Sequence, residues 1–123
     1  MDIGFYIIWE KNSLKSTGNV VGDELFAESL CKSINKQYKS INAELYAPNY
    51  LPKKKLDALI YLNESAPNEK LSRYHYLYFQ NGSEDNIDKI VSSILALQYD
   101  GYIFFSEMIK KTFDEKVQNL NKS

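Results

Sequence analysis

The chain has 123 residues, with 15 basic and 16 acidic side chains, which gives a formal net charge of -1 at pH 7. This length fits one domain, because either half alone would be too small to bury a good core. The balanced charge argues against a protein built mainly to hold DNA or RNA, since phosphate neutralisation needs a basic surplus. The apolar runs are too short to span a bilayer, and the lone cysteine, Cys31, fits a reducing compartment. We therefore expect a cytoplasmic globular protein without a transmembrane segment.

Five apolar segments have the composition of buried strands. Their apolar runs are nearly continuous rather than strictly alternating, which is typical of strands covered on both faces in a parallel sheet. The predicted strands cover residues 3–9, 41–46, 56–62, 74–79 and 101–105.

A helix is predicted over residues 23–38, where the residue pattern is close to the 3.6-residue period. Asp23 and Glu24 lie in its first turn and Lys36 near its end, and both placements complement the helix dipole. The side predicted to face the sheet comprises Leu25, Phe26, Ser29, Leu30, Ser33, Ile34 and Gln37.

Two further helices are predicted to begin after N-capping serines, Ser83 and Ser106, each followed by acidic residues. The third helix is expected to run from residue 107 to about 119. The inward faces predicted for these two helices are Ile87, Ile90, Val91, Ile94 and Leu97, and Met108, Ile109, Phe113 and Val117.

Strands that alternate with helices predict an α/β fold, here a Rossmann-like three-layer sandwich. Its mostly parallel five-stranded sheet would carry helices on both faces. Two connections, 47–55 and 63–73, are shorter than the dozen or more residues that a parallel crossover usually takes, so each would hold at most one short helical turn.

A ligand site is expected at the carboxyl ends of the strands, where open parallel sheets bind their ligands. The long polar loop after the first strand either binds a polar ligand through its amides and hydroxyls or is a solvated loop whose glycines satisfy turn geometry. Asn63 and Glu64 follow the third predicted strand at the same edge. The candidate ligand-binding residues are Trp9, Ser16, Thr17, Gly18, Asn19, Gly22, Asn81, Gly82, Ser106 and Glu107.

The starts of the predicted helices argue against a phosphate site. Asp23, Glu84 and Glu107 bring negative charge to the positive dipole end that an anion would need. Carboxylates accept hydrogen bonds from sugar hydroxyls, so a neutral polyhydroxyl ligand fits better. Residues 16–19 are similar to the phosphate loop of flavodoxins, although their distance from the strand differs from that family.

Other chemically active residue types favour structural roles. His75 is expected to be a partly buried, hydrogen-bonded residue rather than a catalytic base, and Cys31 a small residue of the core or its flank. One histidine and one cysteine give no support to a metal site. The alternating Tyr74, Tyr76 and Tyr78 share one face of their strand, and packing against a helix explains them most simply.

In order along the chain, several segments resemble the N-terminal Rossmann-like domain of GT-B glycosyltransferases. They are the first strand and its polar loop, the glycine-led helix start 22–30, a second strand that ends in Ala47-Pro48, the third strand 56–62, the Gln80-Asn81-Gly82 turn, and the segment 99–107.

This resemblance implies one acceptor-binding domain over residues 1–123, the N-terminal half of a larger glycosyltransferase, with no cofactor of its own. The nucleotide-sugar donor would bind mainly to a C-terminal domain to which nothing here corresponds, so activity alone is not expected. Glu10 or Asp23 would act as general base for the acceptor hydroxyl.

Two alternatives stay open. The chain could be a stand-alone α/β interaction module that pairs with itself or another protein through exposed tyrosines, which are common at interfaces. A flavodoxin-like FMN carrier is the third interpretation.

Overall fold

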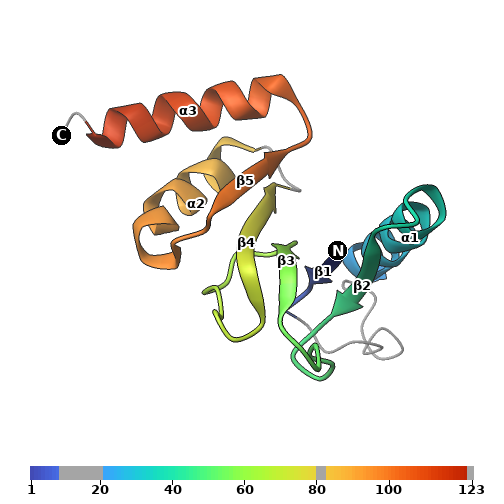
Figure 1. Ribbon diagram of the computed structural model, residues 1–123. Coiled ribbons are helices and arrows are strands. Elements are labelled where there is room, and N and C mark those ends of the chain that lie inside the picture. Colours follow the sequence, from blue (N-terminus) through green and yellow to red (C-terminus); the bar gives the residue numbers. More distant parts are fainter. Residues whose placement is uncertain (9–20, 80–82, 122–123) are drawn as a thin grey trace.

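The computed structural model describes residues 1–8, 21–79 and 83–121. All five predicted strands and all three predicted helices are present, with ends shifted by up to three residues. The largest shift concerns the first strand, which ends at Tyr6 rather than Trp9. In chain order (Figure 1) the elements are β1 (Asp2–Tyr6), α1 (Val21–Gln37), β2 (Asn42–Tyr46), β3 (Leu56–Tyr61), β4 (Ser72–Phe79), α2 (Glu84–Leu97), β5 (Gly101–Phe104) and α3 (Glu107–Asn121).

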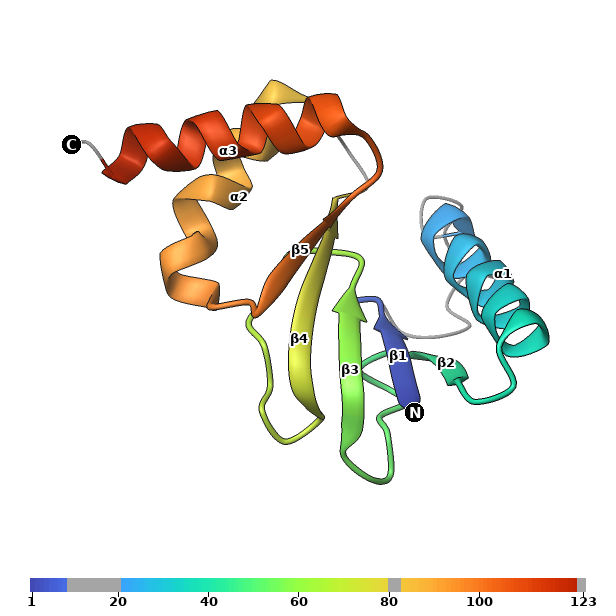
Figure 2. The same ribbon diagram turned by 45° about the horizontal axis from the view of Figure 1, so that its top comes forward.

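The five strands form one sheet in the order β2-β1-β3-β4-β5, and every pairing is parallel. The crossover through α1 and the crossover through α2 proceed in opposite directions along the sheet. Right-handed connections therefore place α1 on one face and α2 on the other, as Figure 2 shows. The predicted α/β sandwich is confirmed. The strand order is that of flavodoxin-like doubly wound sheets, with the reversal between β1 and β3.

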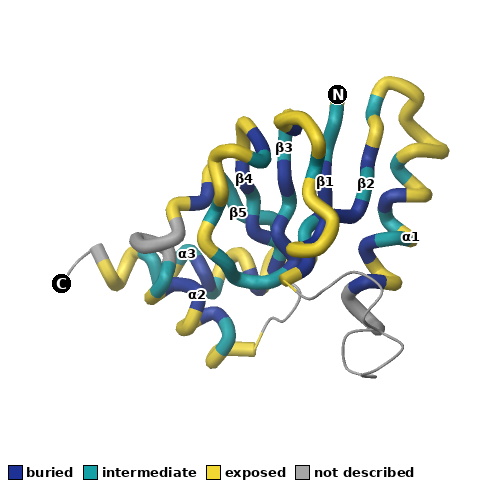
Figure 3. The backbone as a smooth tube through the Cα atoms, turned by 90° about the horizontal axis from the view of Figure 1, so that it is seen from below, coloured by how far each residue is buried: buried dark blue, intermediate teal, exposed yellow. Residues whose placement is uncertain are grey.

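Each face of the sheet has its own hydrophobic core. On the α1 face, Phe5 and Ile7 of the β1 segment pack with Ala27 and Cys31 of α1. On the other face, the side chains of β3 and β4 pack against α2 and α3. Figure 3 shows that the buried positions gather in the central strands. The buried members of this second cluster are Tyr46, Leu56, Leu59, Tyr61, Leu77, Phe79, Ile87, Ile90, Val91, Tyr99, Ile109 and Phe113.

The side of α1 that faces the sheet agrees with the prediction only in part. Leu30 and Ile34 pack against the core as predicted. The described buried residues are Glu24, Ala27 and Cys31, whereas Leu25 and Phe26 are exposed. Small side chains at the contact let a helix lie close to a sheet, so tertiary packing selects Ala27 and Cys31 in place of the larger residues. The prediction that Cys31 is a core residue is confirmed.

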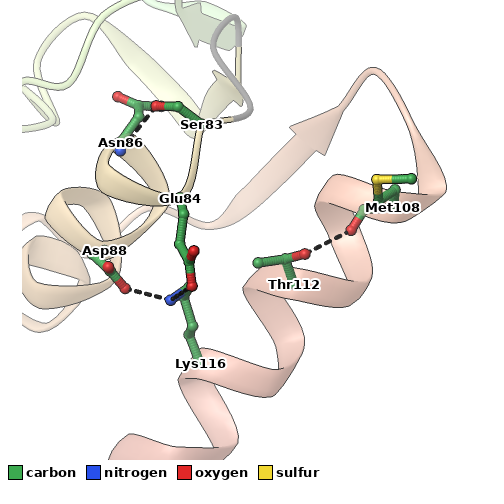
Figure 4. Close-up of polar contacts among 7 residues, drawn as sticks. All are labelled: Ser83, Glu84, Asn86, Asp88, Met108, Thr112 and Lys116. Atoms are coloured by element: carbon green, nitrogen blue, oxygen red, sulfur yellow. Dashed lines mark hydrogen bonds and ion pairs between the residues drawn. The ribbon is translucent and has the colours of Figure 1, made fainter.

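The starts of α2 and α3 agree with the predicted caps. The Asn86 N–H donates to Ser83 Oγ (3.3 Å), and the Ile109 N–H donates to Ser106 Oγ (3.2 Å). The inward position predicted for Met108 is wrong, because its side chain is 78% exposed. Lys116 of α3 ties the two helices together through α2 carboxylates, at 3.2 Å from Glu84 and 2.6 Å from Asp88 (Figure 4).

The connections 47–55 and 62–71 contain no helix and still join parallel strands. Gly4 makes the first of them possible. It has no side chain, and a Cβ built there would lie 2.7 Å from both Leu56 Cδ1 and Tyr46 Cδ2. The side chains on either side of this connection therefore meet directly over β1, where a crossover helix would otherwise lie.

The tyrosines of β4 share the α1 face, as predicted, but a helix covers them only at one end. Phe26 of α1 stacks on Tyr78 with ring centroids 5.8 Å apart. Tyr74, at the other end of β4, is 44% exposed, so packing against a described helix does not account for it. This exposure is compatible with the interaction-module alternative.

Candidate functional site

A crevice of about 370 Å³ lies at the carboxyl ends of β1, β3 and β4. This is the edge of the sheet, next to the strand reversal, where doubly wound folds bind ligands. Its lining combines apolar side chains with two amides and two charged side chains, which come from the connection after β3 and from α2. The lining residues are Ile8, Leu62, Asn63, Glu64, Leu77, Tyr78, Phe79, Asn86, Lys89 and Ile90.

Helix α2 contributes one wall of the crevice. Because α2 follows β4, its first turns stand at the carboxyl edge of the sheet. Ile87 and Ile90 are buried against the core. Asn86 and Lys89 each precede one of these residues, and this neighbouring stripe of the helix lines the crevice.

The charges around the crevice are mixed. Glu64 and Lys89 line it with opposite charges. The first turn of α2 carries Glu84 and Asp85, so the positive end of its dipole already has negative partners. The carboxylates and amides can accept hydrogen bonds, and the amides and the ammonium group can donate them. The arrangement therefore suits a ligand with both donors and acceptors and no large net charge.

Most of the predicted site residues belong to the parts of the chain outside the described ranges. Gly22 and Asp23 fall within the first turn of α1. Ser106 and Glu107 are exposed at the start of α3 and line a separate hollow of about 330 Å³, together with Phe104, Phe105 and Lys110, rather than the crevice. Those outside the described residues are Trp9, Glu10, Ser16, Thr17, Gly18, Asn19, Asn81 and Gly82.

Asn86 and Lys89 were not among the predicted site residues. The sequence pattern could have identified them. A helix that follows a strand begins at the carboxyl edge of the sheet, and the polar residues beside its apolar stripe border any crevice at that edge. Asn63 and Glu64, which follow the third predicted strand, do line the crevice.

Glu24 is a second feature of this edge. Its side chain is only 2% exposed, although it is ionisable and lies in the first turn of α1. Since α1 follows β1, that turn also stands at the carboxyl edge of the sheet. The helix dipole favours a carboxylate there.

His75 lies on β4 away from the crevice, in the interior of the α2 face. It is 5% exposed, and its Nδ1 is 2.9 Å from the Tyr61 hydroxyl. Burial lowers the pKa of the imidazole below its ordinary value of 6.5, against a smaller opposing effect of Asp100. The expectation of a hydrogen-bonded histidine is confirmed, and the residue is more fully buried than expected.

Within residues 1–8, 21–79 and 83–121, three or more His, Cys, Asp or Glu side chains never gather closely enough to hold a metal ion. Across the same part of the chain, each helix is too short or too polar to cross a bilayer.

Comparison of this chain with models of protein families, with curated proteins and with solved structures gives no significant match.

Proposed function

We propose that the crevice at the carboxyl ends of β1, β3 and β4 binds a neutral, hydroxyl-rich ligand, as the acceptor side of a glycosyltransferase would. The observation that carries this proposal is the lining itself. Four polar residues line the crevice beside its apolar side chains, and together they offer donors and acceptors without a large net charge. They are Asn63, Glu64, Asn86 and Lys89. The volume of about 370 Å³ is within the range of small-molecule sites.

The transfer reaction itself is a further step of the proposal. Removing a proton from an acceptor hydroxyl needs a carboxylate within hydrogen-bond reach. Glu10 and Asp23 remain predictions for this role. Glu64 joins them, because its side chain lines the crevice.

Titration of the ¹⁵N-labelled chain with glucose, galactose and N-acetylglucosamine tests the binding proposal, with inorganic phosphate as a parallel probe. We expect saccharide-dependent shifts of the amide signals of Asn63, Glu64, Asn86 and Lys89, and no comparable response to phosphate. A response to phosphate alone, or no saccharide response, would contradict the proposal.

Matched variants locate the response. Asn86→Ala removes a side-chain amide from the crevice and keeps the backbone N–H that donates to the capping Ser83 Oγ. Asn119→Ala makes the same change on an exposed position of α3. We expect weaker saccharide binding only in the first variant; equal effects would place the binding site elsewhere.

The strand order favours FMN as a second candidate ligand. In flavodoxin-like sheets FMN binds at the reversal between β1 and β3. Ile8, after β1, and Leu62, after β3, line the crevice beside that point. The acidic first turn of α2 opposes a phosphate group. Quenching of flavin fluorescence by the chain, without a saccharide response, would favour this candidate over the first.

A further inference from the structure

The buried pair Tyr61–His75 forms a short chain of hydrogen bonds. The Asn68 N–H donates to the Tyr61 hydroxyl oxygen at 3.2 Å, and that oxygen is 2.9 Å from His75 Nδ1. When the phenol donates its single hydrogen to Nδ1, the imidazole hydrogen is on Nε2. We assign this tautomer because the alternative leaves the phenol hydrogen without an acceptor, whereas Nε2 has no partner among the described residues in either tautomer.

This chain of hydrogen bonds fastens residues 62–71, the connection that lacks a helix. Tyr61 holds it through Asn68, and the Tyr99 hydroxyl holds it through the Ser65 N–H (2.9 Å). The same connection supplies Asn63 and Glu64 to the crevice. The position of one crevice wall therefore depends on two buried tyrosines, and one of them bonds to His75.

We propose that protonation of His75 releases residues 62–71 from Tyr61 and, by moving Asn63 and Glu64, weakens ligand binding in the crevice as the pH falls. The effect on binding rests on the proposed function; the release does not.

The chemistry of the pair gives the direction of this effect. A protonated imidazole carries hydrogens on both nitrogens, so Nδ1 no longer accepts the Tyr61 hydrogen and instead donates toward the Tyr61 oxygen. The phenol hydrogen must then turn away from His75, where it competes with the Asn68 N–H for the remaining side of that oxygen. The Nε2 atom is buried without a hydrogen-bond partner of good geometry among the described residues, and burial disfavours the charged ring where it lies. Burial is also the main cause that lowers the pKa of His75 below 6.5. Asp100 and a backbone hydrogen bond with Ser72 act in the opposite direction on the pKa of His75, with a smaller effect than burial.

A polar cavity beside His75 gives the protonated ring room to turn away from Tyr61. This cavity, of about 350 Å³, has Asp100 and Glu69 as anions and Lys55 and Arg73 as cations in its lining. The Asp100 carboxylate already accepts the His75 backbone N–H at 2.7 Å. Asp100 and Glu69 attract an imidazolium and Lys55 repels it. A ring that turns toward the two carboxylates leaves Tyr61 without its acceptor.

The sign follows from proton binding. In the fastened state, with Asn68 bonded to Tyr61, His75 is neutral and its pKa is lowered. This state therefore binds fewer protons than the released state, in which that bond is broken, so acid favours release. The opening equilibrium should rise about tenfold for each unit by which the pKa of the fastened state lies below that of the released state.

Hydrogen exchange on the full chain tests the release without any ligand. His75 is the single histidine of the sequence, so its imidazole NMR signals give the pKa directly. Between about pH 5 and 8, we expect the amide protection of Asn68, whose N–H donates to Tyr61, to fall as His75 becomes protonated. The Ile87 amide, bonded to the Ser83 carbonyl, should not respond.

Two variants separate titration from structure. In His75→Asn the side-chain oxygen can still accept the Tyr61 hydrogen but does not titrate, so Asn68 protection should lose its pH dependence. In Tyr61→Phe, Asn68 should be weakly protected at every pH. Asn68 protection that stays constant while His75 titrates, or that keeps the same midpoint in His75→Asn, overturns the release.

The link to the crevice needs a second measurement. Saccharide affinity of the unaltered chain is compared at about pH 5.5 and about pH 7.5, and a loss at the lower pH is expected to match the measured rise in opening. Equal affinities at both pH values overturn the coupling but leave the crevice proposal intact. Absence of saccharide binding at both values contradicts the crevice proposal and removes the ligand-binding part of this one.

Discussion

Tyr99 and Ser65 exchange two hydrogen bonds across 34 residues of sequence. The Ser65 N–H donates to the Tyr99 hydroxyl at 2.9 Å, and that hydroxyl donates to the Ser65 carbonyl oxygen at 2.5 Å. Connections between parallel strands usually contain a helix that satisfies its own backbone groups. Here the connection 62–71 has no helix, and the distant Tyr99 hydroxyl satisfies the backbone N–H and C=O of Ser65 instead.

Tyr99→Phe should therefore lower the free energy of unfolding by about 1–3 kcal/mol, because both backbone groups of Ser65 lose their partner. Urea denaturation of the two proteins measures the difference. Tyr74→Phe, which removes the same oxygen from an exposed side chain, should change stability by less than about 0.5 kcal/mol. Equal losses in the two variants would count against this role of Tyr99.

Alkaline pH should destabilise the fold through its buried phenols. Burial raises the pKa of Tyr99 from 10.0 to about 12, and it also raises the pKa values of Tyr61 and Tyr102. The folded state thus keeps protons that the unfolded state releases, so stability is full below pH 10 and falls as the pH rises toward 12.

Tyr99 alone should contribute a loss of about 2–3 kcal/mol across this range. Urea denaturation at about pH 8, 10 and 12 checks the slope, and Tyr99→Phe should show a shallower one. A slope that is the same in both proteins would mean that Tyr99 is not the group that titrates.

Gly4→Ala should destabilise the protein more than Gly101→Ala. A Cβ at position 4 would meet side chains from two directions, Leu56 and Tyr46, both at 2.7 Å. At position 101 it would meet only the Tyr76 ring, at 2.9 Å, and that ring is partly exposed and can shift.

Overpacking of this kind costs about 1–3 kcal/mol for Gly4→Ala. Thermal and urea unfolding of the two variants give the comparison. A Gly4→Ala protein as stable as the parent would show that the Tyr46 and Leu56 side chains do not need the space above β1.

Lys116→Met should weaken the association of α2 and α3 in a salt-dependent way. The ammonium group lies 2.6 Å from Asp88 and 3.2 Å from Glu84, and both carboxylates raise the pKa of Lys116. Because the carboxylates face solvent, salt screens the pairs. The variant should unfold at lower urea than the parent at low ionic strength, and the gap should close in high salt; a gap independent of salt would point to lost packing instead.

The existence and type of the elements could be predicted from the sequence, because their signals lie within a few residues of one another. Ser83 and Ser106 cap α2 and α3 as predicted, since a cap bonds to an amide only three residues away. The continuous apolar runs also identified strands that are buried in a parallel sheet.

The burial of Ala27 and the outward positions of Leu25 and Met108 could not be predicted in this way. Both depend on which side chains of other elements lie opposite, and a periodic pattern does not contain that information. Leu25 and Phe26 fit the helical period as well as Ala27 and Cys31 do, but only the small pair is buried, and Phe26 meets the sheet through its stacking on Tyr78 while it stays partly exposed.

The amino-acid sequence by itself determined the local order of this protein: three capped or dipole-matched helices, two of which begin with acidic residues, and five strands. Only the tertiary structure decided that β3 lies on the far side of β1 and that Asn86 meets Asn63 at one crevice. It also decided that Tyr61 lies between His75 and Asn68. The physical reason is the distance along the sequence over which each interaction acts. Caps and helical periodicity depend on neighbouring residues, whereas strand order and side-chain pairing depend on the packing free energy of the whole chain.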